Sequence, residues 1–167
     1  MQVELEYFKV GKTFGGNQNE LSSFTMRMGG CASVTACDLC IYMSLFQDNA
    51  KLYPYDNKKL TAIDYNTFNL AMKPYLRPRF GGINTLTLYV EGIRKYLSKV
   101  EEDSLEIAEF SGSNSLENAM TQVKQTIGQG IPIPFLLLRH RNVKFKQLVW
   151  HWFLIVGYEE CENDLYV

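Results

Sequence analysis

The chain has 167 residues, of which 46% are hydrophobic and 21% charged, and its formal net charge is −1. We expect one domain, residues 1–167, with a sizeable core, and the charge balance indicates neither a nucleic-acid partner nor an anionic membrane. No apolar run reaches the roughly 18 residues that a membrane-spanning helix needs. The N-terminal residues lack the basic-then-apolar order of a signal peptide, which predicts a cytoplasmic location with reduced cysteines.

The first third of the chain predicts one long helix behind a short strand. Residues 2–9 alternate weakly between apolar and polar and predict an edge strand, and residues 12–20 form a loop rich in glycine and asparagine. Ser22 and Ser23 are capping residues before a short link. A helix is predicted over residues 31–46, where apolar side chains recur at helical spacing and fill most other positions, so we expect it to lie at the centre of the fold.

The middle of the chain predicts three further helices and one strand. Apolar side chains recur at helical spacing in residues 61–72 and again in residues 85–97. Residues 105–110 read as a strand. A third helix is predicted from the cap at residues 113–115 to about residue 127, where glycines end it.

The last third predicts strands. Residues 132–138 form a buried strand, residues 140–146 a basic turn, and residues 148–158 a second, strongly apolar strand. A turn at residues 159–163 leads into the start of a returning strand at residues 164–167. Helices followed by a mainly antiparallel sheet are typical of an α+β fold, with the long N-terminal helix packed against the sheet.

A thiol stands at the start of the long predicted helix. Gly29 and Gly30 lead directly into Cys31, so the backbone can bend sharply and a substrate can come close. A helix N-terminus carries partial positive charge and free N–H groups, which favour a thiolate. A buried structural cysteine is the alternative interpretation, because free cysteines are often simply buried.

A histidine far downstream is the matching base. His151 stands near the start of the apolar strand and shares a face with Phe153 and Ile155, the face on which we expect the central helix to pack. A thiol and an imidazole that meet in this way form a nucleophile and its base. The only other histidine, His140, lies in a polar turn and is interpreted as an exposed side chain.

A tetrahedral oxyanion would need hydrogen-bond donors beside the thiol. The backbone N–H of Cys31 is one candidate donor. The second is a side-chain amide upstream, for which Gln18 is the first choice and its neighbours Asn17 and Asn19 are the alternatives. The competing interpretation of this polar cluster is an ordinary turn.

Taken together, these motifs resemble those of papain-like cysteine peptidases, in particular the bacterial group that removes double-glycine leaders from bacteriocins. The matching pieces, in chain order, are Gln18, Gly30-Cys31, Gly128-Gln129-Gly130-Ile131-Pro132 and His151 followed by Leu154-Ile155-Val156-Gly157-Tyr158. The resemblance implies a papain-like fold, with Cys31 as nucleophile, His151 as general base and acid, and Gln18 as oxyanion donor. It implies a peptide or related amide substrate and no cofactor or metal.

The chain departs from the family pattern at two places. The glutamine normally lies about half a dozen residues before the cysteine, so the segment between Gln18 and Cys31 would have to loop out. The family also places an Asn or Asp on the strand that returns past the histidine, to orient the imidazole. Here Asp164 and Asn163 lie close to the turn, and Asp164 is the candidate, although the position opposite His151 is expected at or beyond residue 167.

Three other functions stay open. The same pair could pass the acyl group to an amine, as in an acyltransferase or a transglutaminase-like enzyme, or the chain could be an inactive binding module of this fold. Cys37 and Cys40 have the spacing of a redox or zinc pair. Because they lie inside an apolar helix, core packing is the favoured interpretation.

Overall fold

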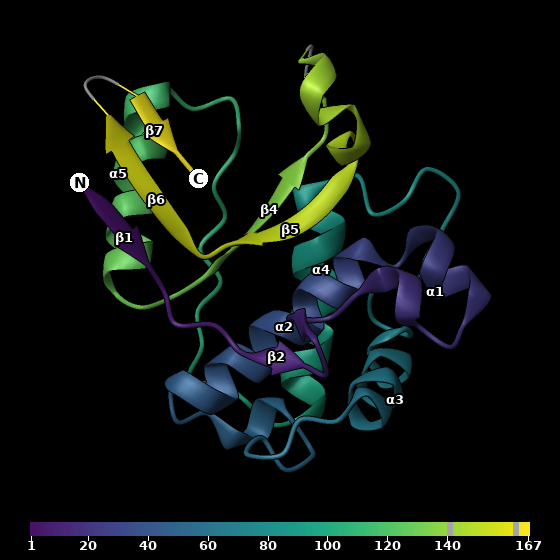
Figure 1. The fold of residues 1–167 in the computed structure, drawn as a ribbon. Helices are drawn as coiled ribbons and strands as arrows, with labels where there is room; N and C mark the ends of the chain where they lie inside the picture. Colours follow the sequence, from purple (N-terminus) through teal and green to yellow (C-terminus); the bar gives the residue numbers. More distant parts are fainter. Residues whose placement is uncertain (140–141, 162–163) are drawn as a thin grey trace.

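The computed structural model describes residues 1–139, 142–161 and 164–167, so His140 and Asn163 lie outside the described residues. Helices and strands are both present, which confirms the α+β class (Figure 1). The helices are α1 (Phe24–Gly29), α2 (Cys31–Phe46), α3 (Ala62–Met72), α4 (Leu86–Lys99) and α5 (Leu116–Gly128), with short 3-10 helices η1 (Gln18–Glu20), η2 (Ala50–Leu52) and η3 (Val143–Leu148). The strands are β1 (Gln2–Glu4), β2 (Lys9–Val10), β3 (Thr13–Phe14), β4 (Ile133–Leu137), β5 (His151–Ile155), β6 (Gly157–Cys161) and β7 (Asp164–Tyr166).

Helix α2 is the centre of the fold, as its composition predicts. It packs against α3 and η2 on one side and against β4 and β5 on the other. Ala36, Cys37 and Ile41 along its length have no exposed surface. A helix that is apolar nearly all round has no solvent face, so other elements must enclose it.

The remaining long helices begin at side-chain caps. Thr61, Thr85 and Ser115 each accept a hydrogen bond from the backbone N–H three residues later. Such caps satisfy one of the otherwise unpaired N–H groups of the first turn. The predicted bounds of α3, α4 and α5 are therefore confirmed to within about two residues.

The strands form small antiparallel sheets. The order of one sheet is β1-β6-β7, and β4 pairs with β5 in another. Only Val156 separates β5 from β6, so one long bent segment joins the two sheets. Helix α5 covers the β1–β6–β7 sheet, whereas α2 lies against β5 (Figure 1).

Several sequence predictions are wrong about the extended segments. The predicted strand 2–9 is shorter, because β1 ends at Glu4. Residues 105–110 form no strand; Leu105 and Ile107 pack against the core while their neighbours face outward, so the alternation reflects one-sided packing without a ladder partner. The predicted strand 148–158 begins later, because Leu148 ends η3. The predicted turn at residue 159 is instead strand, since β6 continues to Cys161.

A short helix was missed between Gln18 and Cys31. The two serines mark a helix start, because Ser23 is the N-cap of α1, and the predicted link that follows them is in fact this helix. Helix α1 ends at Gly29. The next residue, Gly30, is both the C-cap of α1 and the N-cap of α2. Among the described residues, no helix is both long enough and apolar enough to cross a bilayer.

Candidate active site

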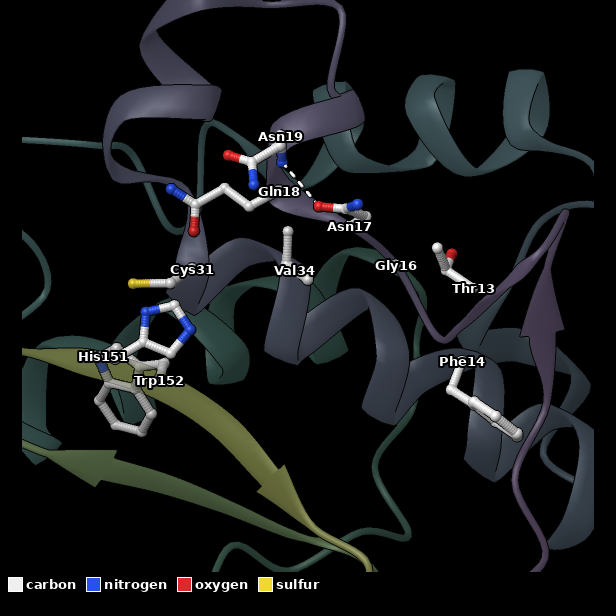
Figure 2. A pocket seen from close by; sticks show the side chains of 10 residues that line it. All are labelled: Thr13, Phe14, Gly16, Asn17, Gln18, Asn19, Cys31, Val34, His151 and Trp152. Carbon is white, nitrogen blue, oxygen red and sulfur yellow. Dashed lines mark hydrogen bonds between the residues drawn. The ribbon is translucent and has the colours of Figure 1, made fainter. Parts of the chain in front are cut away.

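A pocket of about 530 Å³ opens where α2, β5 and the loop around η1 meet. Figure 2 shows Cys31 lying between Gln18 on one side and His151 on the other. The fold brings the three side chains into one pocket, although His151 lies far from the other two in the sequence. The full lining is Thr13, Phe14, Gly16, Asn17, Gln18, Asn19, Cys31, Val34, His151 and Trp152.

The junction of two helices places the thiol. Cys31 is the first residue of α2 and is partly exposed. The N–H of Gly30 donates to the carbonyl of Met26 in α1 at 2.8 Å, and the N–H of Val34 donates to the carbonyl of Gly30 at 2.9 Å. The first N–H groups of a helix have no intrahelical acceptor, so those at the start of α2 are available to an oxyanion beside Cys31.

The two glycines before the cysteine should respond differently to substitution. A Cβ at Gly30 would collide with the backbone carbonyl of Met26, whereas one at Gly29 would meet only Pro78 at an ordinary 3.5 Å. We expect Gly30→Ala to lower the free energy of unfolding by about 1 to 3 kcal/mol. Gly29→Ala is the matched control and should change it by less than about 0.5 kcal/mol. Urea unfolding of both variants is the measurement, and equal losses would contradict this assignment.

Strand β5 presents the imidazole at its first residue. Trp150, just before it, has a left-handed backbone (φ 58°), which is rare for a bulky residue and turns the chain from η3 into the strand. Trp152, just after it, is buried; its indole N–H donates to the carbonyl of Ile83 at 2.6 Å and its ring stacks on Tyr89 at 4.1 Å. The backbone turn at Trp150 and the buried side chain of Trp152 therefore fix the backbone position of His151 between them.

The predicted facing of the strand is wrong. Trp152 packs into the core around α2, whereas Phe153 and Ile155, on the same face as His151, belong to the smaller cluster with α5. His151 still lines the pocket because it is the terminal residue of β5, where the strand passes the start of α2.

Partial burial favours the neutral form of the His151 imidazole, because it lowers the pKa below the ordinary value of 6.5. Within the described residues, none makes a hydrogen bond to this imidazole, and none joins it to the sulfur of Cys31. A neutral ring can accept a proton, and catalytic hydrogen bonds are often long before substrate binds.

Gln18 reaches the pocket despite its long separation from Cys31. Helix α1 takes up the intervening chain, and the Gln18 amide nitrogen donates to the carbonyl of Arg27 in α1 at 2.8 Å. In Figure 2 the amide oxygen lies on the side of Cys31 and the nitrogen points away. An amide nitrogen carries two hydrogens, so one remains after the bond to α1, and the amide must turn to direct an N–H at an oxyanion beside Cys31. Asn17 and Asn19 also line the pocket, where the Asn17 side chain accepts from the Asn19 N–H at 3.0 Å.

Asp164 is not brought to the pocket. It lies on β7, pairs with Cys161 at the far end of β6, and is exposed. Asp164 therefore belongs to the β1–β6–β7 sheet, whereas His151 belongs to the β4–β5 sheet. Asp164 does not line the pocket that holds His151.

Cys37 and Cys40 lie in the core. Both are almost fully buried, and the amide nitrogen of Asn69 lies 3.7 Å from the sulfur of Cys37. Burial raises the pKa of Cys40 to about 12 and that of Cys37 well above its ordinary value, so both remain thiols. Within the part of the chain that the structure describes, no group of three or more His, Cys, Asp or Glu side chains could hold a metal ion.

A buried carboxylate behind the pocket was missed. Asp38, on α2, accepts hydrogen bonds from the hydroxyls of Tyr65 at 2.8 Å and Tyr7 at 3.1 Å, and from the N–H of Gly16 at 3.0 Å. Burial raises its pKa to about 6, although these hydrogen bonds favour the charged form. The signal in the sequence is that Asp38 is the only charged residue between positions 31 and 46.

Comparisons with known proteins give no family assignment. No protein-family model, no curated protein and no solved structure matches the chain.

Proposed function

We propose that the chain is a papain-like thiol hydrolase that cleaves a peptide or related amide bond. The observation that carries this proposal is that Cys31, His151 and Gln18 line one pocket although they lie far apart in the sequence. The position of Cys31 at the first turn of a buried helix supports it, as does the base at the end of a facing strand. The sequence resemblance to papain-like peptidases is consistent with the same roles.

The chemistry would run through an acyl-enzyme. The Cys31 thiol gives its proton to His151 and its sulfur attacks the carbonyl carbon, while the helix N–H groups and Gln18 stabilise the oxyanion. The C–N bond then breaks, and the amine leaves with the proton from His151. Water, deprotonated by His151, attacks the thioester and releases the acid, and the proton returns to the thiol.

Alkylation by iodoacetamide tests the nucleophile and its base. We expect Cys31 to react at least about tenfold faster at pH 7 than Cys161, which is also accessible but stands on β6. Cys37 and Cys40 serve as buried references. His151→Ala should slow the reaction of Cys31, because the thiol loses the group that accepts its proton. Peptide mass mapping after a timed reaction gives each rate.

His140→Ala is the matched control for that variant, since it removes the only other histidine in the sequence. It should leave the rate at Cys31 unchanged. If Cys31 reacts no faster than Cys161, or if both histidine variants slow it equally, the proposed pair is wrong.

A second candidate, an inactive binding module of the same fold, is favoured by one observation. Among the residues that the structure describes, none orients the imidazole of His151 by a hydrogen bond, whereas histidine bases are normally held in one tautomer. A chain whose Cys31 reacts slowly but whose fold is intact would support this candidate over the hydrolase.

The fate of the acyl group separates hydrolysis from transfer. A synthetic peptide with Gly-Gly before the scissile bond is the first substrate to test, because the resemblance is to double-glycine leader peptidases. Added hydroxylamine would yield a hydroxamate if an amine acceptor competes with water. Products that contain only the free acid would favour the hydrolase.

A further inference from the structure

The loop that carries Gln18 is hydrogen-bonded to the helix that bears Cys31 through Gly16. Gly16, two residues before Gln18, donates its N–H to both oxygens of Asp38, at 3.0 and 3.1 Å. Asp38 lies two turns after Cys31 on α2, and positions seven apart share a face of a helix. The helix that bears the thiol therefore also bears the anchor of the loop opposite it.

The loop approaches this carboxylate so closely that only glycine fits. A Cβ at Gly15 would collide with the carboxylate of Asp38, and a Cβ at Gly16 would collide with the hydroxyl of Tyr65. Within the loop itself, the hydroxyl of Thr13 donates to the carbonyl of Gly15 at 3.1 Å. The backbone of residues 15 and 16 is thus held in one place relative to α2.

The carboxylate is itself held by two phenols. Tyr65 from α3 and Tyr7 from the segment after β1 each donate to a different oxygen of Asp38. Asp38 is only 8% exposed, and hydrogen bonds to a buried charge are stronger than those between neutral groups. A buried charge costs free energy, and a core of neutral side chains would avoid that cost. This charge lies beside the pocket loop and binds it through the N–H of Gly16.

We propose that Asp38 is a positioning residue, which holds Gly16 so that Gln18 stands at the oxyanion site beside Cys31. This role rests on the proposed thiol hydrolase function. Asp38 touches no substrate; it acts through Gly16, which it binds, and Asn17, which joins Gly16 to Gln18. Loss of the anchor would leave the nucleophile in place and displace the second oxyanion donor.

Two reactions of Cys31 separate this role from a general structural one. Alkylation by iodoacetamide forms no oxyanion, whereas acylation by p-nitrophenyl acetate does. We expect Asp38→Asn to lower the acylation rate about 10- to 100-fold and to change the alkylation rate less than twofold. In the Gln18→Ala background, Asp38→Asn should add less than a twofold further loss. Gly16→Ala displaces the loop through a collision with Tyr65 while the Asp38 carboxyl itself is kept, so it should show the same selective loss. It replaces Asp38→Asn in the test if that variant does not fold.

Each outcome decides one question. A wild-type chain that is not acylated at Cys31 overturns the hydrolase proposal, and the role of Asp38 with it. If the wild-type chain is acylated, equal losses in alkylation and acylation, no loss in either, or losses that multiply with those of Gln18→Ala overturn the positioning role alone.

Discussion

A chain carrying Cys31→Ala should form no acyl-enzyme with p-nitrophenyl acetate. The wild-type chain should release one equivalent of nitrophenolate in a rapid burst, because acylation of the thiol precedes slower hydrolysis of the thioester. The variant should lose this burst, and its turnover of any amide substrate should fall at least about 10⁴-fold, as expected when a nucleophile is removed. Stopped-flow absorbance measures the burst, and mass spectrometry of the trapped protein locates the acetyl group.

Cys161→Ala is the matched control for this loss. Its thiol is exposed on β6, and it does not line the pocket. The control should keep a burst of one equivalent per chain. A burst that survives in Cys31→Ala and disappears in Cys161→Ala would show that the reactive thiol lies on the sheet and would overturn the proposed site.

The buried acid should make the stability of the chain depend on pH. Because burial raises the pKa of Asp38 from 3.8 to about 6, the folded chain holds this proton more tightly than the unfolded chain does. Stability from this group is then complete below about pH 4 and is lost as the pH rises to about 6. The loss amounts to about 3 kcal/mol, at about 1.4 kcal/mol for each pKa unit. Urea unfolding of wild type and Asp38→Asn between pH 4 and 7 gives this loss as the difference between two curves.

Other titrating groups are shared by the two chains, His151 among them, and cancel in that difference. Tyr65→Phe sharpens the test, because the hydroxyl of Tyr65 favours the charged form of Asp38 and its removal should move the midpoint above pH 6. A difference that stays constant from pH 4 to 7 would contradict the buried, titrating carboxyl.

The long helices could be predicted because their signals are local. Helix α2 is a run of apolar residues with a glycine before it, and threonine or serine caps mark the starts of α3, α4 and α5. Helix α1 was missed because six residues with exposed Phe24 and Met28 show no apolar face.

The strands were harder to predict because their partners are distant. Strand β1 pairs with β6 from the opposite end of the chain, and nothing in either segment specifies the other. The alternation at residues 105–110 is as regular as that of a strand, yet the segment has no neighbour to pair with.

The pocket was predictable in part. Cys31 and His151 stand out because each opens an apolar element, and Gln18 was singled out as an upstream amide. The environment of Asp38 was beyond reach, because Tyr7, Gly16 and Tyr65 meet it only in three dimensions. The sequence indicates only that Asp38 is a single acidic residue within an apolar helix.

The two halves of the proposed catalytic pair are synthesised far apart in time. Helix α2 leaves the ribosome before β5, which follows more than a hundred residues later. A nascent chain with its helices formed would carry Cys31 without a base, because docking of β5 onto α2 is a long-range contact that forms late. The order of synthesis would thus keep the reactivity of the Cys31 thiol low until β5 has docked onto α2.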